Sequence, residues 1–221
     1  MFKINFSKIL GVCTVLFIIL FSIVSCKCDK KIISGDDSDS TKVDSSTLNI
    51  AGKYDSLKGW IYDVGAEKEI VLPNGVKIKA GANSSEAKIV KLLSDVSYNP
   101  SDTTKSFVWT TLDRVYFETG KDILTAESEI QVKNIAEILK AYPKAELKIG
   151  GYTDNSGNSD INKKVSTARA NAVSSKLISL GIPVTNVSSE GFGSEFPVCE
   201  ANDTPECKAQ NRRVDVRIKS K

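Results

Sequence analysis

The alternation of apolar and polar residues predicts four strands in the second half of the chain. Residues 146–151 alternate between two faces, with the period of two that is typical of a strand. One face carries Leu147, Ile149 and Gly151, and the other carries Glu146, Lys148 and Gly150. We expect strands over residues 112–118, 145–152 and 184–190, and a fourth through Val214, Val216 and Ile218.

Helical periodicity separates these strands. Thr125 can cap the N-terminus of a helix that ends before Pro143, and its inner face would carry Ile135, Leu139 and Tyr142. A second long helix is expected from about residue 160 to residue 180, where Gly181 stops it.

This second helix has two neighbouring stripes. Residues at helical spacing form one apolar stripe, namely Ile161, Val165, Ala168 and Ala172. The adjacent stripe is polar and consists of Asn162, Ser166 and Arg169, at i, i+4 and i+7. Asp154 leaves the strand just before this helix, so an acid at the strand exit can face an arginine two turns into the helix.

The order of elements predicts an α+β fold. It reads β-α-β-α-β-(α)-β, a sandwich with helices packed on one face of a mixed four-stranded sheet. We assign residues 111–221 to this domain. Residues 50–110 form a small N-terminal extension, too small for an independent core, in which no chemistry is evident.

Two elements are expected in the extension. Residues 68–72 and 76–79 flank Pro73-Asn74-Gly75, a strong hairpin signal. Ser84 or Ser85 can cap a helix whose apolar face would hold Ile89, Leu92, Leu93 and Val96.

The first residues resemble a bacterial lipoprotein signal. Lys3 and Lys8 precede a largely apolar run over residues 9–24, and Ile23-Val24-Ser25-Cys26 reads as a lipobox. The resemblance implies a signal peptide over residues 1–25, removed before an acylated Cys26 that anchors the protein in the outer membrane with its domain facing the periplasm. The alternative is a transmembrane anchor, for which the run is short. Residues 26–49 would then be the lipid anchor and a flexible acidic linker.

Charge and residue usage exclude several functions. The formal charge is +3 and includes two lysines in the predicted signal, so the remainder is near neutral and lacks the basic footprint of a nucleic-acid binder. The chain has no histidine and no Cys-x-x-Cys, so we expect neither a metal site nor a cofactor. Cys199 and Cys207 stand eight positions apart in a loop rich in turn formers, and an oxidising periplasm would permit a disulfide between them.

The segment GGYTDNSGNSDINKKVSTARANAV, followed by GFGSEFPV and NRRVDVRI, resembles the OmpA-like C-terminal domain over residues 112–219. This family holds peptidoglycan without a covalent bond. The resemblance implies that Asp154 binds the ammonium, and Arg169 the carboxylate, at the free end of a meso-diaminopimelate stem peptide. It implies further contacts from Asn162, from Thr119 and Gly120, and from Arg212 or Arg213.

Other functions are considered beside this one. A peptidoglycan hydrolase would need a metal, a Cys-His pair or paired carboxylates, so we do not expect an enzyme. An anchoring subunit of a larger envelope machine, of stator or secretion type, could use the same wall-binding domain. Further envelope protein partners therefore stay open.

Overall fold

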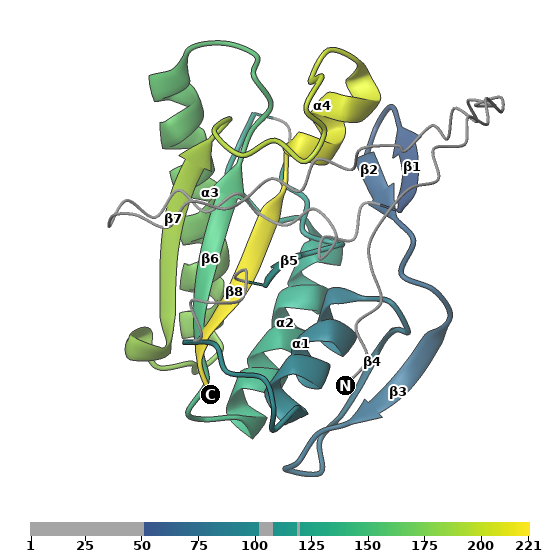
Figure 1. Ribbon diagram of the computed structural model, residues 1–221, viewed down its shortest axis with the longest axis vertical. Helices are drawn as coiled ribbons and strands as arrows, with labels where there is room; N and C mark the ends of the chain where they lie inside the picture. Colours follow the sequence, from purple (N-terminus) through teal and green to yellow (C-terminus); the bar gives the residue numbers. More distant parts are fainter. Residues whose placement is uncertain (1–50, 102–107, 119) are drawn as a thin grey trace, which may run out of the picture. The chain divides into compact units, whose positions relative to one another are not determined.

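The structure, a computed structural model, describes residues 51–101, 108–118 and 120–221 (Figure 1), which all belong to one compact unit. The expected signal peptide, the lipidation site Cys26, the linker and Thr119 lie outside the described residues. In the part that is described, no helix has the length and apolarity to cross a membrane.

A mixed four-stranded sheet forms the centre, and the expected α+β fold is confirmed. Its spatial order is β5-β8-β6-β7, in which β6 and β7 run parallel while β8 is antiparallel to both of its neighbours. The strands are β5 (Trp109–Thr111), β6 (Glu146–Tyr152), β7 (Val187–Gly193) and β8 (Val214–Ser220).

Three helices pack on this sheet through one apolar cluster. They are α1 (Ser85–Ser94), α2 (Ala126–Ala141) and α3 (Ser159–Ser179), and a short helix α4 (Pro205–Asn211) precedes β8. Ile135, Leu147, Ile149, Leu177 and Val216 are among the fully or almost fully buried members of the cluster. Thr125 caps α2 as expected, and Gly181 follows the end of α3 with φ of 94°.

In the first half of α3, the polar stripe faces the sheet and the apolar stripe faces outward, which is the opposite of what the sequence pattern suggests. Ile161 is 60% exposed, whereas Asn162 and Ser166 are buried. The sheet beneath is glycine-lined, and a Cβ added to Gly151 would lie 2.1 Å from the carbonyl oxygen of Ser166. Helix and strand are therefore too close for branched side chains between them, and small polar residues occupy that face instead.

Two strand expectations were wrong in position. The segment 112–118 is not a strand, because Asp113 and Arg114 lie in a turn and β5 ends at Thr111. Strand β5 thus begins before the boundary that we set at residue 111. In the segment 184–190, residues Val184–Asn186 form a short 3-10 helix, and the strand begins only at Val187.

The extension contains two hairpins. The expected one is present as β3 (Glu67–Val71) and β4 (Lys77–Gly81). A second, β1 (Gly52–Asp55) with β2 (Gly59–Tyr62), was not anticipated. Ser84 caps α1, but Val96 is 98% exposed because the helix ends at Ser94 with Asp95 as its C-cap.

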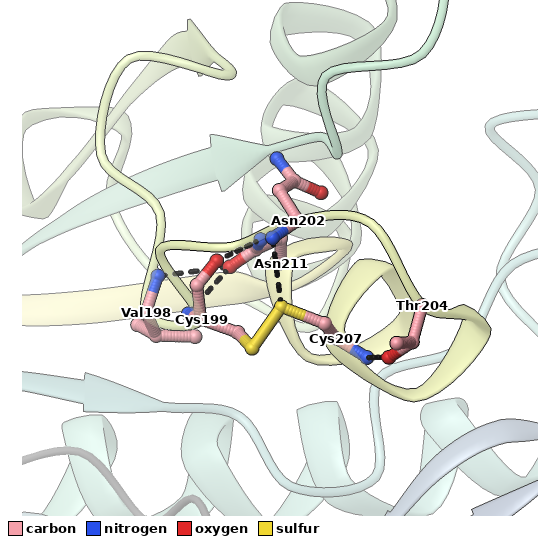
Figure 2. The surroundings of a disulfide bond; sticks show 6 residues. All are labelled: Val198, Cys199, Asn202, Thr204, Cys207 and Asn211. Atoms are coloured by element: carbon pink, nitrogen blue, oxygen red, sulfur yellow. Dashed lines mark hydrogen bonds between the residues drawn. A yellow bond between two sulfur atoms is a disulfide. The ribbon is translucent and has the colours of Figure 1, made fainter.

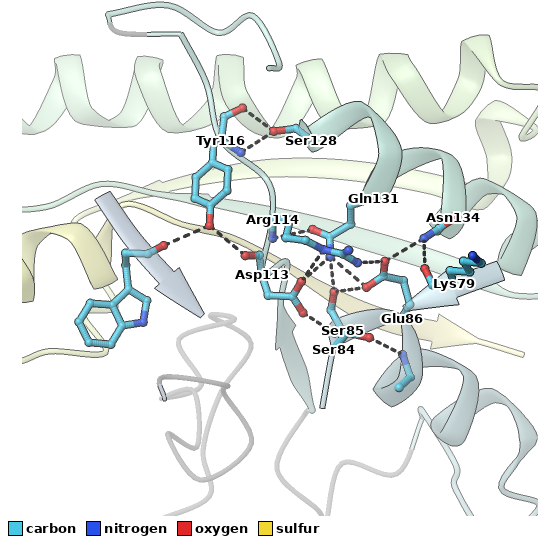
Figure 3. Close-up of polar contacts among 12 residues, drawn as sticks. Lys79, Ser84, Ser85, Glu86, Asp113, Arg114, Tyr116, Ser128, Gln131 and Asn134 are labelled. Carbon is cyan, nitrogen blue, oxygen red and sulfur yellow. Dashed lines mark hydrogen bonds and ion pairs between the residues drawn. The ribbon is translucent and has the colours of Figure 1, made fainter. Parts of the chain in front are cut away.

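A buried polar network joins the extension to the rest of the unit (Figure 3). Glu86 of α1 pairs with Arg114, and the Asp113 carboxylate accepts hydrogen bonds from the Ser85 backbone N–H and from Gln131 Nε2 (2.7 Å). Burial and the nearby Glu86 charge raise the pKa of Asp113. The extension therefore packs on the domain as one body with it.

Candidate functional site

The loop between β6 and α3 holds Asp154 in a fixed position. The Asp154 Oδ1 atom accepts a hydrogen bond from the Ser156 N–H at 2.8 Å. Asn162 Nδ2 reaches back from α3 to the carbonyl oxygens of Asp154 (3.3 Å) and Ser156 (3.1 Å). Asn158 caps the helix through its side chain. Asn162 thus shapes the loop that presents the Asp154 carboxylate.

Arg212 is the direct partner of Asp154. Its Nη1 donates to Asp154 Oδ2 at 2.6 Å, from a side chain that is 38% exposed. Burial alone would raise the pKa of Asp154, but the hydrogen bonds from Arg212 and Ser156 outweigh it and leave the pKa below its usual value. Asp154 is therefore ionised at neutral pH.

Arg169 interacts electrostatically with this pair, and no salt bridge to a described residue compensates its charge. Its guanidinium carbon is 5.2 Å from the centre of the Phe117 ring. Its Nε is buried and has no hydrogen-bond partner in the described part of the chain. Burial lowers the pKa of Arg169 and the Arg212 charge lowers it further, while Asp154 and Asp122 raise it. Asp154, Arg169 and Arg212 thus act on one another electrostatically.

Arg213 is held inside the fold. Its Nε donates to Asp215 Oδ2 at 2.9 Å, and both side chains are almost fully buried. The guanidinium lies 3.9 Å from the centre of the Tyr152 ring and donates to the Phe196 carbonyl at 3.1 Å. Of the two arginines expected at the site, Arg212 has a 38% exposed side chain, whereas the Arg213 side chain is only 2% exposed and pairs with Asp215 of β8.

Two hollows meet at Arg169. A cavity of about 120 Å³ is lined by Arg169, Arg212 and Phe117 together with residues of the β1–β2 hairpin. A second, larger and more open hollow of about 350 Å³ is lined by residues that include Gly120, Val165 and Arg169. The structure therefore brings Gly120, Arg169 and Arg212 to adjoining surfaces. The sequence did not predict that the β1–β2 hairpin would line this cavity. A local pattern in residues 52–62 cannot indicate a contact with residues more than fifty positions later.

A disulfide fixes the segment that leads into Arg212 (Figure 2). Cys199 and Cys207 are bonded with an S–S distance of 1.98 Å. Asn211 accepts from the Val198 and Cys199 N–H groups and donates to the Cys199 carbonyl. The Thr204 hydroxyl accepts from the Cys207 N–H. Together these bonds fix the end of α4, which directly precedes Arg212, to the loop that contains Val198 and Cys199.

The arrangement suits a small ligand that carries both charges. An ionised carboxylate, Asp154, and a guanidinium with an N–H unused within the described residues, Arg169, act on one another electrostatically, so an ammonium and a carboxylate of one ligand could each find an opposite charge there. Within the described residues, no three histidine, cysteine or acidic side chains are grouped so as to hold a metal ion.

Comparisons with known proteins find relatives of the second half of the chain. Over 106 residues the chain is 35% identical to the probable lipoprotein YiaD of Escherichia coli K12, covering 48% of this chain and 48% of that protein. Over 97 residues it is 39% identical to the peptidoglycan-binding protein ArfA of Mycobacterium bovis, covering 44% and 29%. The chain spans about half the length, or less, of the curated relatives that it matches.

Among solved structures, the peptidoglycan-associated lipoprotein of Burkholderia pseudomallei is 31% identical with a TM-score of 0.44, over 47% of this chain and 87% of that one. The model of the OmpA family matches residues 116–212, which run from the segment before α2 to the residue after α4 and include Asp154, Arg169 and Arg212. The chain therefore contains an OmpA family domain over these residues.

Proposed function

We propose that this domain binds peptidoglycan non-covalently by gripping the free end of a meso-diaminopimelate stem peptide. Arg169 binds the carboxylate of that end and Asp154 binds its ammonium. The observation that carries the proposal is that Arg169 Nε has no hydrogen-bond partner among the described residues and interacts with an ionised Asp154. The similarity to ArfA, a protein named as peptidoglycan-binding, supports it. OmpA family domains are binding modules and not enzymes.

The bond between Arg212 and Asp154 is compatible with this role. It uses one oxygen of the carboxylate, and a carboxylate has about four acceptor positions on its two oxygens. Capacity for a ligand ammonium is therefore left. Because the Arg212 side chain is 38% exposed, it can also turn toward a second ligand oxygen.

The wall chemistry tests the proposal. Purified chain should co-sediment with sacculi of the diaminopimelate type and not with lysine-type sacculi, because lysine lacks the carboxylate that Arg169 holds. Equal binding to both wall types would rule out the clamp.

Two variants test the residues. Asp154→Ala and Arg169→Ala should each weaken binding several-fold or more, by up to roughly 2–5 kcal/mol for a charge pair that is fully desolvated. Lys176→Ala is the matched control, since Lys176 is a cation on the same helix that pairs with Glu129 away from the site at 2.7 Å. Retention of either alanine variant at the wild-type level would refute the assignment.

We further propose that the protein is an outer-membrane lipoprotein, tethered through an acylated Cys26 and a linker over residues 26–49. The lipobox in the sequence supports this, as does the similarity to a probable lipoprotein. The tether would link the outer membrane to the cell wall. Labelling cells with an alkyne fatty acid should mark the wild-type protein and not Cys26→Ser. Equal labelling of the variant would place the anchor elsewhere.

A further inference from the structure

The β1–β2 hairpin contributes a wall to the cavity beside Arg169, although it lies outside the OmpA family match. Trp60 and Tyr62 both line the cavity. In the hairpin register, Trp60 pairs with Tyr54 and Tyr62 pairs with Gly52, so alternate residues put both aromatic rings on one face. The extension thus supplies two aromatic side chains to a site that the family domain builds from arginines.

The hairpin is docked on the domain by several contacts. The Tyr116 hydroxyl donates to the Trp60 carbonyl at 3.3 Å. Lys58 pairs with Glu127 at 3.5 Å, and helix α4 packs against both strands. The Tyr62 side chain is half-buried in the hairpin interface, and burial raises the pKa of its phenol. The wall is therefore part of the folded unit.

Two residues that line this cavity each carry a donor without an acceptor among the described residues. Trp60 Nε1 and Arg169 Nε are both buried without a hydrogen-bond partner in the described residues, and both side chains line the same cavity. An indole and a guanidinium can only donate, and a buried donor without an acceptor is costly. A ligand group that hydrogen-bonds with Trp60 Nε1 and Arg169 Nε would therefore need acceptor atoms such as oxygens.

The charges select the kind of acceptor. Asp154 neutralises Arg212, and Asp215 neutralises Arg213. Within the described part of the chain, Arg169 has no carboxylate within salt-bridge distance. A carboxylate fits both the unused charge and the unused N–H groups. The cavity of about 120 Å³ has room for one small group of this size together with a few waters.

We propose that the β1–β2 hairpin forms one side of the ligand pocket and that Trp60 is a further binding residue, whose Nε1–H donates to the carboxylate that Arg169 binds. This inference rests on the proposed function. It makes residues 51–62 part of the wall-binding site, and the extension thereby takes part in recognition as well as in packing. The competing possibility, a hairpin that merely covers the site, is an outcome of the test.

The test is Trp60→Phe, which removes the indole N–H group and keeps an aromatic ring at this position. Trp60→Phe in the full chain should bind the tripeptide L-alanyl-γ-D-glutamyl-meso-diaminopimelate about tenfold more weakly by calorimetry, a factor that corresponds to about 1.4 kcal/mol. Lys53→Ala is the matched control, since Lys53 pairs with Ile61 on the other face of the hairpin and should bind as the wild type does. Thermal unfolding checks that the variants fold.

Tryptophan fluorescence gives a second readout, whose main signal comes from the wild-type chain. The chain has two tryptophans, Trp60 and Trp109. The tripeptide should change the fluorescence of the wild-type chain and not that of Trp60→Phe, in which only the core residue Trp109 emits.

The outcomes separate the two proposals. Wild-type affinity in Trp60→Phe, with binding lost in Arg169→Ala, would overturn the role of the hairpin and leave the proposed function standing. Tighter binding by Trp60→Phe would identify the hairpin as a cover and also overturn it. No binding of the tripeptide or of sacculi by the wild-type chain would instead overturn the proposed function.

Discussion

Replacing Gly151 by alanine should separate helix α3 from the sheet. The added Cβ would lie 2.1 Å from the Ser166 carbonyl oxygen and 2.9 Å from its carbon. An ordinary carbon–oxygen contact is about 3.3 Å, so the helix must move by roughly 1 Å. The obstacle is backbone on both sides, and no side-chain rotation relieves it.

The cost follows from two losses. Overpacking of this kind costs about 1–3 kcal/mol. The same movement stretches the bond from the Gly193 N–H to the Ser166 hydroxyl, now 2.9 Å, and an unmade buried bond costs about 1–3 kcal/mol more. We expect a total of about 2–6 kcal/mol, and hence a fall in Tm of roughly 5–20 °C for a unit of this size.

Gly150→Ala provides the matched control. It is the neighbouring residue on the same strand, and its Cβ would face the opposite side, where the nearest atoms belong to the side chains of Phe192, Tyr152 and Trp109 at 3.0–3.1 Å. Side chains can yield by a few tenths of an ångström, so this variant should lose far less stability. Thermal unfolding followed by circular dichroism measures both. Equal losses from the two substitutions would refute the argument from close approach.

Three further predictions concern charges and covalent bonds. Arg114→Ala should lower the free energy of unfolding in urea by about 3–5 kcal/mol, because it leaves Glu86 charged and buried without its cation, and a loss below 1 kcal/mol would contradict this. Since the pKa of Asp154 is lowered on folding, the stability it contributes is complete above the usual carboxyl pKa near 4 and is lost as the pH falls through the lower folded value. The Tm difference between wild type and Asp154→Asn should accordingly be constant from pH 7 to pH 5 and shrink below pH 4, and a difference that persists undiminished in strong acid would refute it. Cys199→Ser with Cys207→Ser should cost about 2–3 kcal/mol and weaken wall binding slightly, and a reductant should lower the Tm of the wild type but not that of the double variant.

Local patterns predicted the elements that depend on neighbouring residues. Thr125 as a cap, Gly181 as a stop and Asn74-Gly75 as a turn act within a few positions, and each has the expected place in the structure. The alternation in 214–218 likewise predicted β8. These features follow from backbone geometry and need no knowledge of distant contacts.

Local patterns could not predict the features that depend on which distant residues an element packs against. The apolar Ile161 faces outward because the buried side of α3 meets glycines, and glycines on another strand leave no periodic signal in the helix itself. The segment 112–118 looked like a strand, but Asp113 and Arg114 are drawn into bonds with α1 and α2 and form a turn. The arginine bonded to Asp154 proved to be Arg212, 58 positions away, and spacing along one helix could point only to Arg169.

The position of β8 in the sheet has a consequence for folding. This strand lies between β5 and β6, and its pairing of Trp109 with Arg217 joins segments more than a hundred residues apart. Strand β5 has no other neighbour in the sheet, so it cannot be ordered by pairing until the last strand has been synthesised. Contacts of such long sequence separation slow folding, because a large loop must close before they form. An incomplete chain that stops before Val214 would expose the edges of both β5 and β6, and we expect it to be a target for proteases or to aggregate.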